Sequence, residues 1–184
     1  AISNGWFMFG FLSIFSSFHI DISQIAISLK YSTILFFISN IEQLKTLPKL
    51  AKISSQPKSI FNLLKKNFQI ILFINLFILF SIGAFFFLNI LPLNIKEVLS
   101  SNLFINTAIT FLLISITIPF VTYDMHKGRE GTFAFLMVCF ITIDLINITN
   151  PSKDISFHYG IHLLLFLCSY TVPVFYNRLK YKNI

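Results

Sequence analysis

FHYGIHLLLFLCSYTVPVFY, residues 157–176, is an apolar run of the length that crosses a bilayer, and it carries two histidines near its start. About 20 apolar residues are enough for an α-helix to span the hydrocarbon core. His158 and His162 are four residues apart, so on a helix both project from one face. The preceding apolar run, 132–149, carries Asp144 near its end. This part of the chain therefore predicts two neighbouring transmembrane helices with polar groups near one membrane boundary.

The composition of the whole chain places it among membrane proteins. Of its 184 residues, 55% are hydrophobic and 11% are charged, whereas a soluble domain has roughly 25% charged residues. The apolar residues are continuous rather than alternating, which favours helices over a transmembrane barrel. We expect an all-α, polytopic protein with a single transmembrane domain over residues 1–184. Its six predicted spans lie at about residues 5–20, 22–41, 69–91, 103–121, 132–149 and 157–176. The first span is short at its start, and we expect further residues upstream of Ala1.

The basic residues predict the orientation of these spans. Six spans put both termini on one side, together with the second-to-third and fourth-to-fifth connections. That side holds eleven of the 14 Lys and Arg residues, and the opposite connections hold only Lys96 and Lys153. The positive-inside rule then places both termini on the cytoplasmic side. Because the basic residues sort by membrane side, the net charge of +7 does not indicate nucleic-acid binding. We expect a bacterial inner membrane or an organellar inner membrane.

The longest polar segment, residues 42–67, is predicted to be a basic cytoplasmic loop. Pro48 and Pro57 are expected to interrupt any continuous helix there. Between them and the third span, Ile60, Phe61, Leu64 and Phe68 recur at helical spacing. This face suits the headgroup region of a membrane, and the surrounding lysines suit anionic lipid or a partner protein. The alternative is an ordinary basic loop. The six lysines are Lys45, Lys49, Lys52, Lys58, Lys65 and Lys66.

A cluster of ionisable residues is predicted at one depth in the outer leaflet. Lys30 and Asp144 are the only charged residues inside predicted spans, and such charges usually pair or face a wet cavity. Counting residues from the span ends puts both of them, with His162, roughly 8–12 Å below the outer boundary. The cluster would comprise Lys30, Asp144, His158, His162, His19 and Asp21.

Several chemistries fit that cluster. Lys30 and Asp144 could form a structural ion pair, or Lys30 could extend to the interface and leave Asp144 protonated. The imidazoles and carboxylates also suit a proton or solute path. His158, His162 and Asp144 could instead bind a metal, although no HExxH motif is present. Haem would need His19 as the opposite axial ligand and fits less well.

The segment YDMHKGREG, residues 123–131, is the most charge-dense short connection. Its glycines allow close backbone approach, so the segment could bind a phosphate or a nucleotide. The alternative is a tight, solvated turn between two spans. The residues concerned are Asp124, His126, Arg129 and Glu130.

The sequence contains no P-loop, GxSxG, paired-cysteine or dinucleotide motif, and it assigns no catalytic residue or cofactor. We therefore expect a non-catalytic subunit of a larger membrane complex, with membrane lipids and other membrane subunits as partners. The alternatives are a small transporter or channel with a path past Lys30, Asp144 and His162, and a metal-dependent membrane enzyme.

Overall fold

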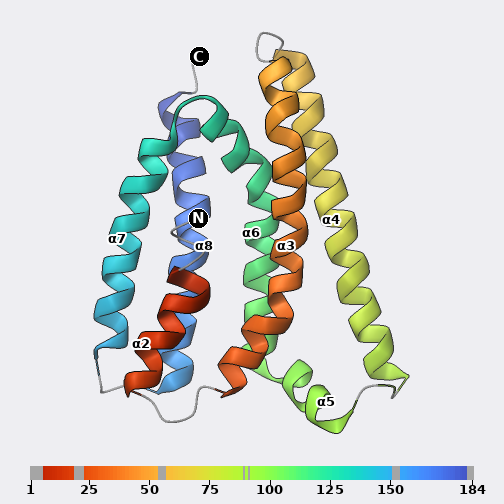
Figure 1. Ribbon diagram of the computed structural model, residues 1–184, viewed down its shortest axis with the longest axis vertical. Helices are drawn as coiled ribbons and strands as arrows, with labels where there is room; N and C mark the ends of the chain where they lie inside the picture. The colour runs from red at the N-terminus through yellow and green to blue at the C-terminus, as the bar shows by residue number, and fades with distance from the viewer. Residues whose placement is uncertain are drawn as a thin grey trace.

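The computed structural model describes residues 6–18, 23–53, 57–88, 90, 92–150 and 154–181, and within these ranges the chain folds only into helices (Figure 1). The N-terminal part begins with a π-helical turn, η1, and continues as α2. Two long helices follow, and then a short helix, α5, leads into three more long helices. The bounds are η1 Trp6–Gly10, α2 Phe11–Phe18, α3 Ser23–Lys52, α4 Pro57–Phe87, α5 Leu93–Ser100, α6 Asn102–His126, α7 Glu130–Ile148 and α8 Ile155–Lys180.

Five of the described helices, α3, α4, α6, α7 and α8, are long and apolar enough to cross a membrane. The shortest, α7, has 19 residues and is about 28 Å long, close to the thickness of the hydrocarbon core. These helices agree with the expected all-α, multi-pass architecture. The described part of the first expected span, residues 6–18, is shorter than each of the five.

The long helices form one bundle with α6 in the middle; α3, α6 and α8 run in one direction, and α4 and α7 run in the opposite direction (Figure 1). α6 lies between α3 and α8; α4 packs on α3 and α6, and α7 packs on α8 (Figure 1). The buried side of α6 includes Phe111, Ile114 and Ile118. Because α4 and α7 each have packed neighbours on one side only, they form the two edges of the bundle.

Aromatic rings fill the core where four elements meet. Phe7 of η1 stacks on Phe166 of α8 at a ring-centroid distance of 4.8 Å. Phe111 of α6 meets Phe166 edge-on at 5.6 Å, and Phe36 of α3 meets Phe111 edge-on at 5.9 Å. Hydrocarbon outside a membrane protein removes most of the hydrophobic driving force, so close packing of this kind must hold the helices together. The core therefore fixes η1 against α8.

The connection between α3 and α4 differs from the predicted loop. α3 continues through Pro48 to Lys52, and α4 begins at Pro57. A proline at the first position of a helix loses no backbone hydrogen bond, so Pro57 starts α4 rather than breaking it. Pro48 does cost α3 a hydrogen bond. Leu50 offsets this cost, because it is fully buried beyond the proline against the first turns of α4.

The α3–α4 hairpin is consequently a rigid helical extension. At about 45 Å for its 30 residues, α3 exceeds the roughly 30 Å hydrocarbon core. Ile60 and Leu64 of α4 pack with Leu50, and the amide of Asn67 donates a hydrogen bond to the hydroxyl of Thr46. The basic segment therefore presents its lysines from two packed helices.

Candidate functional site

The two histidines of α8 lie inside the protein, as their spacing predicts. His158 and His162 are both 0% exposed, and both face α7. With three partners from α7 and η1 they form a set of buried hydrogen bonds that we call the polar ladder: Trp6, Asp144, Asn147, His158 and His162.

The central rung of the polar ladder joins His162 to Asp144. Nδ1 of His162 lies 2.8 Å from Oδ2 of Asp144, and Nε2 lies 2.9 Å from the backbone oxygen of Phe7. A carbonyl oxygen only accepts, so Nε2 must carry a hydrogen. One further proton then lies between Nδ1 and Oδ2. Whichever atom holds that proton, the pair has no net charge, which makes its burial tolerable.

Trp6 adds a second donor to the same carboxylate. Its Nε1 donates to Oδ2 of Asp144 at 3.0 Å. Gly10, one helical turn further on, leaves room for the indole: a Cβ at that position would lie 2.8 Å from Cε3 of Trp6. The absence of a side chain at Gly10 is therefore a condition for the Trp6–Asp144 hydrogen bond.

The second rung joins His158 to Asn147. Nδ1 of His158 donates to Oδ1 of Asn147 at 3.0 Å, and the Asn147 amide donates back to the backbone oxygen of His158 at 3.0 Å. Asn147 follows Asp144 by three residues, so both lie on one face of α7. Because α7 and α8 are antiparallel, Asp144 and Asn147 lie opposite His162 and His158, respectively.

A third buried contact ties this region to α6. The hydroxyl of Thr107 donates to the backbone oxygen of Leu103, so the Tyr159 hydroxyl, 2.8 Å away, donates to Thr107. The Tyr159 ring stacks on His162 at 6.0 Å. Three helices and η1 are therefore joined around one histidine.

The expected Lys30–Asp144 ion pair is not formed. Lys30 is exposed on α3 and makes no ion pair with a described residue, whereas Asp144 is fully buried and bonded to Trp6 and His162. The sequence analysis expected the two charges at one depth, but a common depth does not determine which way a helix faces. The two other members of the predicted cluster, His19 and Asp21, lie outside the described residues.

The geometry does not support the metal alternative. Both ring nitrogens of His162 are engaged, one by a carboxylate and one by a backbone carbonyl. Among the residues that the structure describes, no three His, Cys, Asp or Glu side chains come together as a metal site. The sequence analysis did not anticipate that Asn147 would bind His158 and that Trp6 would bind Asp144, so that these side chains hydrogen-bond within the protein.

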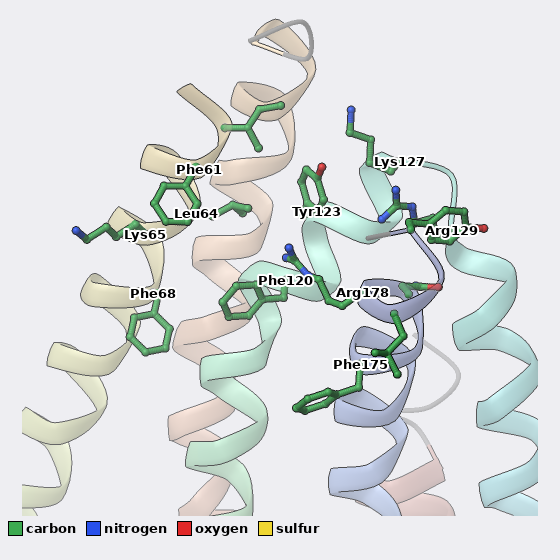
Figure 2. A pocket seen from close by; sticks show the side chains of 14 residues that line it. Phe61, Leu64, Lys65, Phe68, Phe120, Tyr123, Lys127, Arg129, Phe175 and Arg178 are labelled. Carbon is green, nitrogen blue, oxygen red and sulfur yellow. The ribbon is translucent and has the colours of Figure 1, made fainter. Parts of the chain in front are cut away.

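A second polar region lies at the opposite end of the bundle, between α4 and α8 and over the end of α6 (Figure 2). It is a cavity of about 870 Å³, which we call the basic cavity. Aromatic and basic side chains dominate its wall. The wall residues are Ile60, Phe61, Leu64, Lys65, Phe68, Phe120, Tyr123, Lys127, Arg129, Phe175, Asn177, Arg178, Leu179 and Tyr181.

Asp124 lies behind the wall of the basic cavity, fully buried at the end of α6, and binds two of the wall residues. One carboxylate oxygen accepts from Nη1 of Arg129 at 3.3 Å, and the other accepts from the amide of Asn177 at 3.3 Å. Gly128 makes the intervening turn with a φ of +69°, a conformation that glycine adopts without strain. The turn therefore directs Arg129 back onto the helix end and toward α8.

The two sequence candidates at this end have mixed outcomes. Of the charged residues in the 123–131 turn, Asp124 and Arg129 come together, while Glu130 is exposed at the start of α7 and His126 is half-buried. Of the six lysines, Lys65 lines the basic cavity and Lys45 pairs with Glu42 at 2.9 Å. The other four are exposed: Lys49, Lys52, Lys58 and Lys66.

Arg178 and Asn177 of α8 are the functional candidates that the sequence missed. In the sequence, Arg178 is only one of the eleven Lys and Arg residues of the predicted cytoplasmic side. The guanidinium of Arg178 lies 5.4 Å from the ring centre of Phe120 and 5.6 Å from that of Tyr123. Only the fold brings the last turns of α8 and the first turns of α4 to opposite walls of one cavity.

Comparison of the chain with protein-family models, with curated proteins and with solved structures gives no match.

Proposed function

We propose that this chain is a non-catalytic, multi-pass subunit of a larger membrane assembly. The observation that carries the proposal is the closure of the polar ladder. Its central histidine and carboxylate are fully buried and bonded to each other, to Trp6 and to backbone. Such an arrangement suits the fixing of helices better than contact with a substrate.

The edges of the bundle offer surfaces for partners. Large apolar side chains point outward from both edge helices, among them Phe73 and Phe80 of α4, exposed by 73% and 76%. On α7, Phe135 and Ile146 are similarly exposed. Aromatic side chains provide large packing surfaces for helix association inside a membrane. We therefore assign the assembly contacts to α4 and α7.

Native purification in a mild detergent, followed by identification of co-purifying membrane proteins, tests this function. We expect partners in fixed stoichiometry, and we expect Phe73→Ala with Phe80→Ala to reduce their retention. Ile109→Ala, at an exposed position of α6, is the control. Purification of the intact chain as a monomer with lipid alone, from native membranes under crosslinking, would contradict the proposal.

The same proposal includes six spans with both termini in the cytoplasm. The basic ends of α3 and α4, the α6–α7 turn and the end of α8 lie at one end of the bundle (Figure 1). This common location supports a cytoplasmic assignment for that end, because Lys and Arg residues are enriched on the cytoplasmic side of membrane proteins.

Cysteine labelling tests the orientation. In a background with Cys139 and Cys168 replaced by Ala, we expect Ala51→Cys to react only from the cytoplasmic side and Ser100→Cys only from the other side. Both positions are exposed, and they lie at opposite ends of the long helices. Labelling of both from one side would contradict the topology.

A proton path is the second candidate, and one observation favours it. A single proton lies between His162 and Asp144, and Oδ1 of Asp144 makes no hydrogen bond to any described residue although it is buried. A carboxylate oxygen of this kind can exchange a proton with a transient water.

Proton flux in proteoliposomes separates the two candidates. A conducting path requires His162→Phe to abolish the flux, whereas His126→Phe, the same change at the other end of the bundle, should leave it unchanged. Wild-type flux equal to that of empty liposomes would remove this candidate and leave the subunit proposal standing.

A further inference from the structure

The basic cavity has an excess of positive charge that the described protein does not neutralise. Its wall contains four basic side chains and no acidic one: Lys65, Lys127, Arg129 and Arg178. Asp124, behind the wall, pairs with Arg129. Arg178 forms no ion pair with a described residue, and neither do Lys65 and Lys127. At least three cations are therefore available to an anion.

Aromatic faces hold several of these cations in place. Arg178 lies over Phe120 and Tyr123, and the guanidinium of Arg129 lies 4.0 Å from the ring centre of Tyr181. A ring face beside a guanidinium attracts it without using its N–H groups, and apart from the Nη1 of Arg129 that donates to Asp124, these groups can form hydrogen bonds to an anion. The site is thus preorganised for planar, bidentate recognition of an oxyanion such as phosphate.

The remaining wall is mostly apolar and continues onto the outer surface of the bundle. Phe61, Phe175 and Leu179 line the cavity and are 66%, 71% and 74% exposed. In Figure 2, Phe68 of α4 and Phe175 of α8 lie below the basic side chains, on the side of the cavity nearer the middle of the bundle. A volume of about 870 Å³ lies within the range of small-ligand sites. A purely water-soluble anion would leave these apolar faces without a partner.

We propose that the basic cavity binds the phosphate headgroup of an anionic phospholipid, with an acyl chain lying between α4 and α8. The cations sit where the apolar part of the helices ends, which is the depth of a lipid phosphate. Arg178 and Arg129 contact the phosphate, and Lys65 and Lys127 supply further positive charge. The phenylalanines of α4 and α8 contact the chain. This inference goes beyond the subunit role and does not depend on it.

Lipid binding to the purified chain in detergent, followed by native mass spectrometry and by the melting temperature, tests the proposal. The probes are phosphatidylglycerol, phosphatidylcholine and, as soluble anions, glycerol phosphate and inorganic phosphate. We expect phosphatidylglycerol to bind at least about tenfold more tightly than the other three. Phosphatidylcholine carries a cationic choline that the basic side chains repel, and the two soluble anions lack the acyl chains that contact the phenylalanines.

Two matched pairs of variants locate the site. Lys65→Gln should weaken phosphatidylglycerol binding, whereas Lys66→Gln, at the adjacent exposed position outside the cavity wall, should not. Arg178→Gln should weaken it about tenfold, and Lys180→Gln, on the same helix but outside the wall, should leave it within about twofold.

Three results would overturn the proposal. Equal losses for Lys65→Gln and Lys66→Gln would mean general attraction of a basic surface to anionic lipid. Equal binding of phosphatidylcholine would mean that the cavity does not select a lipid with net negative charge, which contradicts the proposed anionic lipid. Equal stabilisation by inorganic phosphate or glycerol phosphate would identify a site for a soluble anion, with no role for the acyl chain.

Discussion

The two ends of the bundle treat polar side chains in opposite ways. In the polar ladder, His162 and Asp144 share a proton and are sealed by Trp6 and Phe7. At the basic cavity, Asp124 pairs with Arg129, whereas Arg178, Lys65 and Lys127 form no ion pair with a described residue. Buried polar groups with internal partners fix a structure, while preorganised cations without partners indicate a ligand.

Substitution of Asp144 is the strongest test of the structural role of the polar ladder. Asp144→Ala should lower the free energy of unfolding by about 3–5 kcal/mol, because it leaves His162 and Trp6 buried without their acceptor. Lys30→Ala should change it by less than about 0.5 kcal/mol, since Lys30 is exposed and unpaired with described residues. Unfolding in mixed micelles measures both values. Equal losses in the free energy of unfolding would indicate that Lys30 and Asp144 form a pair, and would contradict the polar ladder.

A smaller effect is expected from Gly10→Ala. Its new methyl group would clash with the indole of Trp6 and weaken the hydrogen bond to Asp144, at a cost of about 1–3 kcal/mol. Trp6 is the single tryptophan of the chain, so its fluorescence emission reports the displacement.

Gly160→Ala is the matched control. A Cβ there would meet nothing within 4 Å, so we expect unchanged emission and equal or slightly higher stability. If both alanine variants gave the wild-type spectrum, the tight approach of Gly10 to Trp6 would have no structural role.

Much of this architecture follows from the sequence, and the failures have specific physical causes. Apolar length predicted the long helices, and helical spacing placed His158 and His162 on one buried face. Counting residues from span ends also brought His162 to Asp144. The same depth argument was applied to Lys30, yet Lys30 faces outward. The buried face of α3 carries serines as well as apolar residues, so the sequence pattern did not show which side of α3 faces the core.

Other site residues were missed because their roles depend on distant parts of the chain. Trp6 reaches Asp144 across 138 residues, and Asn177 reaches Asp124 across 53. The one available local signal was Asn147, which follows Asp144 by three residues and so shares its helix face. Pro48 was overinterpreted, since burial of Leu50 outweighs one lost hydrogen bond.

The turn beside the basic cavity provides the next prediction. Gly128→Ala should cost about 1–2 kcal/mol, because a side chain at φ +69° is strained. It should also weaken phosphatidylglycerol binding, since the turn directs Arg129. Gly131→Ala, inside α7 with open space around its Cβ, should affect neither quantity. Loss of stability without loss of lipid binding would show that Arg129 is dispensable for the lipid.

The smallest expected effects come from two buried asparagines of α4, and they test the general rule behind the comparison. Asn67 donates to Thr46, whereas neither side-chain polar atom of Asn75 has a hydrogen-bond partner among the described residues. Both are buried, at 7% and 0% exposure, and both lie on the same helix. If hydrogen-bond partners rather than burial decide stability, the same substitution should change the free energy of unfolding in opposite directions at the two positions.

Asn67→Leu should lower the free energy of unfolding by about 0.6 kcal/mol, the average value of such a bond in a membrane protein. Asn75→Leu should raise it by a similar amount, because it removes unsatisfied polar atoms while keeping the volume. Unfolding of both variants in the same micelles measures the difference, and equal destabilisation would mean that Asn75 has a polar partner in the membrane after all.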